Sequence, residues 1–380
     1  MGNIMTYLDE YGGYSFAEKP FGPVDGLVMA HFSYYVFDGI VPVSFGKERA
    51  VKLRELEGRM DPDYFISVTW ERTGNRELFY KIIQSRRFRS TAACCYVNET
   101  DEESGMQFSA ITLLLGNGDI YIAFRGTDDA LIGWKEDFYM AYRTPVAAQE
   151  RSRTYFEEVA YLMMRKRHAR FYLGGHSKGG NLAVYAAITC KDKLKRRIGA
   201  VYNYDGPGFR PDYLARFDKS RIEDKIIKYI PSESFVGMLM QGEEEYILIE
   251  SSEIGVLQHI PLSWKIEGSN FVISDKQDMR RMQLYRKMNA WLLALDREKI
   301  KGFLDSFFEL LETTQAQTLS ELSQEAWKNW IGIWNAYRNL DQDTKEIMRE
   351  LCIFLIQIAA RDQKERVVPR IFNSPEKITF

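Results

Sequence analysis

Short apolar runs bounded by polar or glycine residues dominate the middle of the chain. Residues 92–97, 108–115 and 120–124 each have the length and composition of a β-strand. The turn Gly-Asn-Gly-Asp at residues 116–119 separates the last two runs. Because Asn and Gly readily adopt the positive φ angles of tight turns, this segment predicts a β-hairpin.

Helical and strand periods then alternate along the chain. Residues 154–164 carry apolar side chains at helical spacing, residues 171–173 form a short apolar run, and residues 182–187 return to a helical pattern. A further apolar run follows at residues 201–204. This alternation predicts an α/β fold with a mostly parallel sheet that helices cover on both faces.

Helical patterns lie on both sides of this region. Residues 23–80 have mainly helical spacing, and beyond about residue 275 four more helical runs follow, at 279–295, 300–311, 319–337 and 345–360. We therefore expect three parts: a helical N-terminal region packed on the core (1–90), an α/β core (91–272) and a helical C-terminal extension (273–380).

The charge of the chain is close to balanced. Its 380 residues contain 51 Lys and Arg against 53 Asp and Glu, which disfavours nucleic acid as the main partner. Residues 1–13 include Asp9 and Glu10 but no Lys or Arg, the wrong charge for a secretory signal. We therefore expect a cytoplasmic protein. No metal-ligand spacing occurs among its cysteines, which we expect to be reduced core residues: Cys94, Cys95, Cys190 and Cys352.

A tryptophan-rich segment in the C-terminal extension has two interpretations. Trp327, Trp330 and Trp334 recur at helical spacing, which is typical of a buried helix face and is the interpretation we favour. The alternative is a surface for a partner or for transient contact with a membrane. The apolar run at residues 351–360 is about half the roughly 20 residues of a membrane span, so we expect a buried helix there.

The motif Gly-x-Ser-x-Gly at residues 175–179 nominates Ser177 as a nucleophile. It lies between an apolar run and a helical pattern, and a sharp strand-to-helix turn lifts a serine Oγ clear of the sheet. Gly175 and Gly179 leave room for that strained backbone. The helix N-terminus at Lys178 directs amide donors towards negative charge that develops beside the serine.

A serine nucleophile needs a general base, most often a histidine. The chain has four histidines. His31 lies in the N-terminal region, His168 ends the basic run Arg-Lys-Arg-His, and His176 adjoins the serine with its side chain expected to point away from the hydroxyl. His259 alone follows Ser177, which is the usual chain order in this architecture. We predict that His259 is the base, in a loop that closes over the site.

The third member of such a triad is a carboxylate that accepts the Nδ1 hydrogen of the imidazole. Asp205 directly follows the apolar run 201–204, so it lies at the carboxyl end of a predicted strand. Open α/β folds place their binding and catalytic residues at this end of the strands. Glu233 follows another apolar run, residues 226–230, and is nearer His259 in the sequence. We favour Asp205 and keep Glu233 as the alternative acid.

Charge that develops on a substrate oxygen needs fixed hydrogen-bond donors. The amide of Lys178, directly after the nucleophile, is one predicted donor. The other is Thr127, through its amide or its hydroxyl, because residues 121–128 end an apolar run in a tight Arg-Gly-Thr-Asp turn. We expect Arg125 in that turn to pair with a carboxylate beneath the loop.

Three of these segments, taken in order, resemble the class 3 lipases. They are Phe-Arg-Gly-Thr at 124–127, the stretch at 134–137, and Gly-His-Ser-Lys-Gly-Gly at 175–180. Class 3 lipases are α/β hydrolases that cleave acyl esters of glycerolipids. The resemblance therefore implies a lipase-like α/β-hydrolase core over about residues 113–265.

A fuller set of segments resembles a bacterial lipase-like subgroup whose function is unassigned. It adds Tyr-Asn-Tyr-Asp-Gly-Pro-Gly-Phe at 202–209 and Gln-His at 258–259, followed by Ser-Trp at 263–264. The resemblance to the lipases implies the following roles: nucleophile Ser177, base His259, and oxyanion hole Thr127 with Lys178.

The chain departs from the lipase pattern at the acid. Class 3 lipases place it in an Asn-Asp-x-Val type of segment, and the matching stretch here, residues 232–236, has Ser234 where the aspartate is expected. Asp205 resembles the alternative acid position of pancreatic-type lipases, which favours relocation of the acid. If the acid is lost instead, the chain is a weak hydrolase or a hydrolase-derived binding or scaffold protein.

Together these features predict a serine hydrolase that cleaves carboxylic esters through an acyl-enzyme on Ser177. The resemblance favours a lipid acyl ester as substrate, with small esters or thioesters next. The expected chemistry requires no metal and no organic cofactor. Oligomeric state and acyl chain length do not follow from the sequence.

Overall fold

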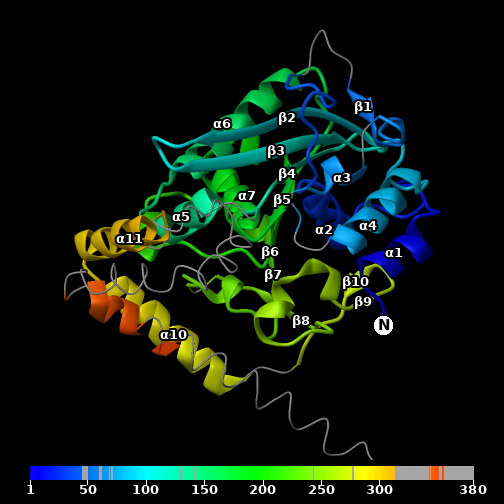
Figure 1. Cartoon of the computed structure of the whole chain (residues 1–380). Coiled ribbons are helices and arrows are strands. Elements are labelled where there is room, and N and C mark those ends of the chain that lie inside the picture. The colour runs from blue at the N-terminus through cyan, green and yellow to red at the C-terminus, as the bar shows by residue number, and fades with distance from the viewer. Residues whose placement is uncertain are drawn as a thin grey trace, which may run out of the picture.

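An eight-stranded sheet forms the centre of the computed structural model (Figure 1). The structure describes residues 1–44, 50–59, 62–67, 69, 72–128, 131–140, 143–242, 244–275, 278–312, 342, 344–350 and 353–354. The strands follow one another across the sheet in chain order: β1 (Val51–Lys52), β2 (Ala92–Asp101), β3 (Met106–Leu114), β4 (Ile120–Phe124), β5 (Phe171–His176), β6 (Ile198–Tyr204), β7 (Ile226–Pro231) and β8 (Ile247–Ile249). A separate ribbon pairs β9 (Ile266–Glu267) with β10 (Asn270–Phe271).

The sheet changes from antiparallel to parallel pairing at β4. Neighbours from β1 to β4 are antiparallel, and neighbours from β4 to β8 are parallel. The hairpin predicted around residues 116–119 is confirmed, since β3 and β4 pair directly across that turn. The predicted mostly parallel sheet is also confirmed, and its parallel strands all end at one edge.

Helices connect and flank these strands. Their bounds are α1 (Ile4–Tyr11), α2 (Pro23–Phe32), α3 (Pro62–Phe65), α4 (Arg72–Gln84), α5 (Leu131–Met140), α6 (Ala147–Leu162), α7 (Lys178–Thr189), α8 (Asp192–Lys195), α9 (Pro211–Leu214), α10 (Met279–Ala294) and α11 (Arg297–Glu312). The helical runs predicted at 154–164, 279–295 and 300–311 are therefore confirmed in α6, α10 and α11.

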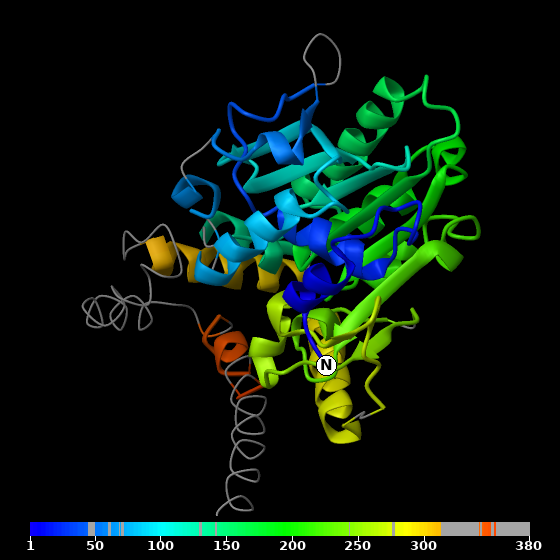
Figure 2. The same ribbon diagram turned by 90° about the vertical axis from the view of Figure 1, so that its right-hand side faces the viewer.

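Each face of the sheet has its own apolar core. Along β4, Ile122 and Phe124 pack on one side with α6 and α7, whereas Tyr121 and Ala123 pack on the other with α1, α2 and α4. This split follows from the two-residue repeat of a strand. In Figure 2 the N-terminal helices lie in front of the sheet and α6 lies behind it. The lipase-like α/β-hydrolase core is thus a sheet covered by helices on both faces.

The N-terminal region is less helical than its spacing predicts. Among the described residues between α2 and α4, the chain forms the edge strand β1 and only short helical turns. Gly39 and Gly58 have φ angles of 73° and 77°, which a continuous helix does not allow. Leu53 and Leu56 are buried all the same, because β1 pairs with β2 and carries this segment onto the sheet. Their periodic burial comes from this pairing and from one short 3-10 turn, η1 (Leu53–Glu55), and not from a continuous α-helix.

A fully buried ion pair holds the N-terminal helices together. Arg87 donates to both carboxylate oxygens of Asp25, from Nε at 2.5 Å and from Nη2 at 2.6 Å. The Tyr7 hydroxyl donates to the same carboxylate at 2.7 Å, and the Gly22 amide at 2.9 Å. One carboxylate on α2 therefore ties α1 to the segment that leads into β2.

We expect Asp25→Ala to lower the free energy of unfolding by about 3–5 kcal/mol, because it leaves the buried Arg87 charge without a partner. Urea unfolding followed by far-UV circular dichroism measures the loss. Glu18→Ala is the control, since its ion pair with Arg86 is half-exposed. Equal stability of the two variants would contradict a stabilising role for the buried pair.

The C-terminal helices lie beside the edge at which the parallel strands end (Figure 1). Asn289 on α10 donates to the carbonyl of Met238 at 2.8 Å, and Tyr139 on α5 donates to Asp305 on α11 at 2.7 Å. The tryptophan-rich face predicted around Trp327 and half of the 345–360 run lie outside the described residues. Within the described ranges, no helix has the length and apolar composition to cross a membrane.

Candidate active site

Ser177 occupies a strained turn between β5 and α7. Its φ of 58° and ψ of −132° lie outside the regions that residues with a side chain usually adopt. Its amide donates to the carbonyl of Tyr204 on β6 at 2.9 Å, which ties the turn to the neighbouring strand. The strand, turn and helix that the motif predicts are all present, and the amide of Lys178 lies at the start of α7.

The two glycines of the motif allow the helix to lie close to the strands. A Cβ on Gly175 would lie 2.3 Å from the carbonyl carbon of Gly179. A Cβ on Gly179 would lie 2.1 Å from the carbonyl oxygen of Phe124 on β4. Both approaches involve backbone atoms that cannot rotate away, so only glycine fits at these positions.

Asp205 and His259 meet beside this turn. The register pairs His176 with Tyr204, so Asp205 follows β6 at the same level at which Ser177 follows β5. The Asp205 carboxylate is fully buried, and its Oδ2 lies 2.6 Å from Nδ1 of His259. His259 ends the short 3-10 helix η4 (Gly255–His259) and keeps 24% of its side chain exposed.

Glu233, the alternative acid, has a different partner. Its Oε2 accepts a hydrogen bond from the Gly255 amide at 2.7 Å, at the start of η4. Its own amide donates to Oε1 of Gln258 at 2.9 Å. Glu233 therefore holds the turn that carries His259, while Asp205 contacts the imidazole itself. Of the two predicted carboxylates, the geometry favours Asp205.

His176 supports His259 in a way that the sequence did not reveal. The two rings lie 4.4 Å apart between centroids, and Nε2 of His176 is 2.8 Å from the carbonyl oxygen of His259. Since a carbonyl only accepts, Nε2 carries the hydrogen, and Nδ1 is left to accept from the Tyr34 hydroxyl at 3.1 Å. Burial lowers the pKa of His176 well below its usual value, which keeps the ring neutral.

Buried residues surround the Asp205 carboxylate. Ser234 donates from Oγ to Oδ2 of Asp205 at 2.5 Å, so the serine at the expected acid position contacts the acid itself. A Cβ on Gly237 would lie 2.2 Å from Oδ1 of Asp205, which leaves no room for a larger residue. Lys228 donates to the Gly237 carbonyl at 2.8 Å, and burial lowers its pKa to about 8 although the Asp205 charge opposes this.

The predicted Arg-Gly-Thr turn faces the nucleophile turn. A Cβ on Gly126 would lie 3.1 Å from Cβ of Ser177. Thr127 donates from Oγ1 to Oδ2 of Asp137 at 2.5 Å, so its hydroxyl is already engaged and its amide is the better candidate donor to a substrate oxygen. Arg125 lies 3.3 Å from a carboxylate oxygen of Asp128, which confirms its predicted pairing with a carboxylate.

The Lys178 side chain forms part of the core and not of the substrate surface. It is 1% exposed, and Nζ donates to Oε2 of Glu136 on α5 at 3.2 Å. Nζ also donates to the Gln107 carbonyl on β3 at 3.2 Å. Because the ammonium is held by these groups, the predicted role of Lys178 in an oxyanion hole rests on its amide alone.

The Asp137 carboxyl makes the stability of the folded protein depend on pH. Burial raises its pKa from 3.8 to about 6, against the opposing effect of the Lys178 charge. The folded state therefore holds the Asp137 proton more tightly than the unfolded state does. Stability contributed by the protonated group is complete below about pH 4 and is lost as the pH rises through about 6.

We expect Asp137→Asn to remove this loss of stability. Urea unfolding of the wild type and the variant between pH 4 and pH 7 measures it, and the variant should gain stability relative to the wild type up to about pH 6. Asp305→Asn is the control, because hydrogen bonds from Tyr139 and Lys301 help to lower the pKa of that carboxyl. Parallel curves for wild type and Asp137→Asn would contradict the raised pKa.

Among the residues that the structure describes, no three His, Cys, Asp or Glu side chains are arranged to hold a metal. Three of the four cysteines, Cys94, Cys95 and Cys190, are buried free thiols, as predicted. Cys352 lies outside the described part of the chain.

Together, the mostly parallel sheet, the serine turn between a strand and a helix, and the paired histidine and aspartate have the arrangement of an α/β-hydrolase fold. The sequence model of a family described as Mbeg1-like matches residues 82–309, more than half of the 380-residue chain. The chain belongs to the Mbeg1-like family.

Several solved structures are similar to this chain at low sequence identity. A fungal lipase is 12% identical with a TM-score of 0.44, and the match covers 72% of this chain and 87% of that chain. The MDLA protein of Penicillium cyclopium is 11% identical with a TM-score of 0.42, covering 73% and 90% of the two chains. For a Rhizomucor miehei lipase the identity is 16%, the TM-score 0.30 and the shares 40% and 56%, so the chain spans about half of that protein. No curated protein matches the chain.

Proposed function

We propose that this protein is a serine hydrolase that cleaves carboxylic esters through an acyl-enzyme on Ser177. The observation that carries the proposal is the buried Asp205 carboxylate 2.6 Å from Nδ1 of His259, beside the strained serine turn. A carboxylate in this place orients the imidazole and stabilises its protonated form. The structure therefore supports relocation of the acid over its loss, and disfavours a purely binding or scaffold role.

The proposed reaction begins when Oγ of Ser177 attacks the acyl carbon while His259 takes the hydroxyl proton. The amides of Lys178 and Thr127 stabilise the negative charge on the carbonyl oxygen of the tetrahedral intermediate. Its collapse forms the acyl-enzyme and releases the alcohol, which receives the proton from His259. Water, deprotonated by His259, then attacks the acyl carbon and releases the acid, and the proton returns to Ser177.

We propose lipid acyl esters as the substrate class, with small esters or thioesters next. The support is the resemblance of the segments at 124–127 and 175–180 to class 3 lipases. We also propose that the protein acts in the cytoplasm, on the charge and cysteine pattern of the chain. The site as proposed needs no metal or organic cofactor, because serine, histidine and backbone amides supply each step.

Covalent labelling with a fluorophosphonate probe tests the proposal directly. The probe reacts with an activated serine, so it should label the wild type and leave Ser177→Ala unlabelled. Ser104→Ala, in the exposed turn between β2 and β3, is the matched control and should label like the wild type. Absence of labelling in folded wild-type protein would favour the binding or scaffold alternative.

A further inference from the structure

Two basic segments, residues 161–170 and 191–197, meet where β5 and β6 begin. They carry nine Lys and Arg side chains and a single Asp. Arg197 joins them, since its Nη2 donates to the carbonyl of Lys166 at 2.8 Å and to that of Ala169 at 3.2 Å. Their exposed side chains form what we call the basic-apolar surface: Tyr161, Leu162, Met164, Arg165, Lys166, Arg167, Lys193 and Arg196.

The positive charge of this surface is not neutralised by its neighbours. The carboxylates that border it pair with other cations, in the pairs Asp119–Arg170, Glu157–Lys191 and Asp192–Lys195. Within the described part of the chain, no ion pair involves the five cations of the surface: Arg165, Lys166, Arg167, Lys193 and Arg196. A chain with balanced total charge therefore presents one strongly positive face.

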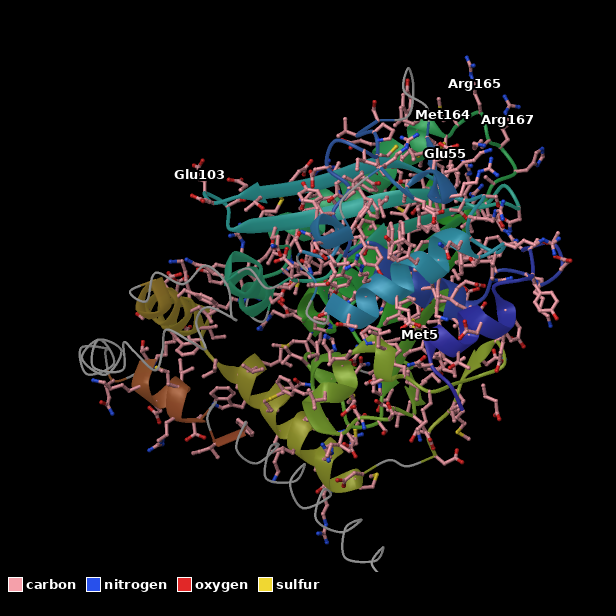
Figure 3. All side chains as sticks on the ribbon, turned by 45° about the vertical axis from the view of Figure 1, so that its right-hand side comes forward. Met5, Glu55, Glu103, Met164, Arg165 and Arg167 are labelled. Carbon is pink, nitrogen blue, oxygen red and sulfur yellow. The ribbon has the colours of Figure 1, made fainter. Side chains whose placement is uncertain are left out.

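Large apolar side chains are exposed among these cations. Tyr161 is 68% exposed, Leu162 40% and Met164 54%, at the end of α6. The intervening Met163 is only 1% exposed and anchors this end of the helix in the core. In Figure 3 the labelled Met164, Arg165 and Arg167 project outward from the same corner of the molecule.

We propose that the basic-apolar surface docks the protein on bilayers that contain anionic phospholipids. Lys and Arg side chains near such a membrane each contribute roughly a fivefold gain in affinity, and the gain falls as salt rises. Apolar side chains at the same level insert into the boundary between headgroups and acyl chains. The exposed tyrosine, leucine and methionine favour a membrane over nucleic acid, because a phosphate backbone offers no apolar layer to receive them.

This surface lies at the opposite edge of the sheet from Ser177. Phe171 begins β5 beside the surface, and Ser177 follows its last residue, so the strand separates them by about 20 Å. Glu103, at the β2–β3 turn beyond the catalytic edge, lies on the far side of Figure 3 from Arg165 and Arg167. The docked protein thus directs its serine away from the bilayer that holds it, and docking does not require hydrolysis.

Flotation of Ser177→Ala protein with lipid vesicles tests the proposal independently of any esterase activity. We expect binding to vesicles of phosphatidylcholine with phosphatidylglycerol, and little binding to phosphatidylcholine alone. Adding Arg165→Glu, Lys166→Glu and Arg167→Glu should weaken binding at least about 100-fold. The charge-matched control carries Arg280→Glu, Arg286→Glu and Lys287→Glu on exposed positions of α10 and should bind like its parent.

A second variant separates the membrane from other polyanions. Tyr161→Ser, Leu162→Ser and Met164→Ser should weaken binding to the anionic vesicles and leave all the cations in place. The proposal is overturned if the parent does not float with anionic vesicles or if both charge variants bind equally. It is also overturned if a DNA duplex binds more tightly than the vesicles and the serine substitutions have no effect. Circular dichroism of each variant confirms that it is folded.

Discussion

Replacing Ser177 by alanine is expected to lower the turnover of a short-chain nitrophenyl ester about 10⁶-fold. The reason is that the acyl-enzyme forms on Oγ of this residue, and the strained turn presents no other hydroxyl at that point. Binding groups and the oxyanion amides persist in the variant, so a small rate above that in water should survive. Initial rates at saturating ester measure the effect.

The control for this variant is Ser104→Ala, which removes an exposed hydroxyl from the β2–β3 turn. Its turnover should equal that of the wild type. If Ser177→Ala kept more than a few per cent of the wild-type rate, the acyl-enzyme would have to form elsewhere, and the proposed mechanism would be wrong. Unfolding curves of both variants show whether a change in rate reflects a change in folding.

Asp205→Asn is expected to lower turnover about 10⁴-fold, the loss typical of a triad without its acid. An asparagine amide offers His259 the wrong hydrogen-bonding group and no negative charge. Oδ2 of Asp205 lies 2.6 Å from Nδ1 of His259, so removing this carboxylate should change the orientation and basicity of the imidazole directly. The same nitrophenyl ester measures it, and fluorophosphonate labelling should slow in parallel.

Glu233→Gln is the matched comparison, since it also exchanges a carboxylate for an amide. The glutamine oxygen still accepts from the Gly255 amide, so turnover should stay within about tenfold of the wild type. A dead Glu233→Gln with an active Asp205→Asn would reverse the assignment of the acid. Large losses in both would mean that the rate depends on the η4 turn as well as on the carboxylate beside the imidazole.

Much of the fold was predictable because it depends on local pattern. The apolar runs at 120–124 and 226–230 are strands over nearly the same residues, since strands whose two faces are both covered appear in the sequence as short continuous apolar runs. The helical region predicted from the spacing at 23–80 is in part wrong. Leu53 and Leu56 are buried because β1 pairs with β2 at the sheet edge. A period shows which residues are buried but not which element buries them.

The candidate site also has one part that the sequence predicts and one part that depends on the tertiary structure. Ser177 and its glycines are recognisable because the nucleophile turn needs five adjacent residues. His259 is recognisable because no other histidine follows Ser177 in the sequence. The choice between Asp205 and Glu233 was open, since both follow predicted strands. It depends on which carboxylate reaches the imidazole across 54 residues, and only the register of β6 beside β5 determines that.

By itself, then, the sequence determined the nucleophile turn, the strands around it and the identity of the histidine, because each depends on neighbouring residues or on elimination. Tertiary structure alone decided that Asp205 contacts that histidine while Ser234 and Glu233 support the arrangement. It also joined two separate basic runs into one exposed surface. Contacts between distant segments depend on strand order and register, and residue pattern does not encode these locally.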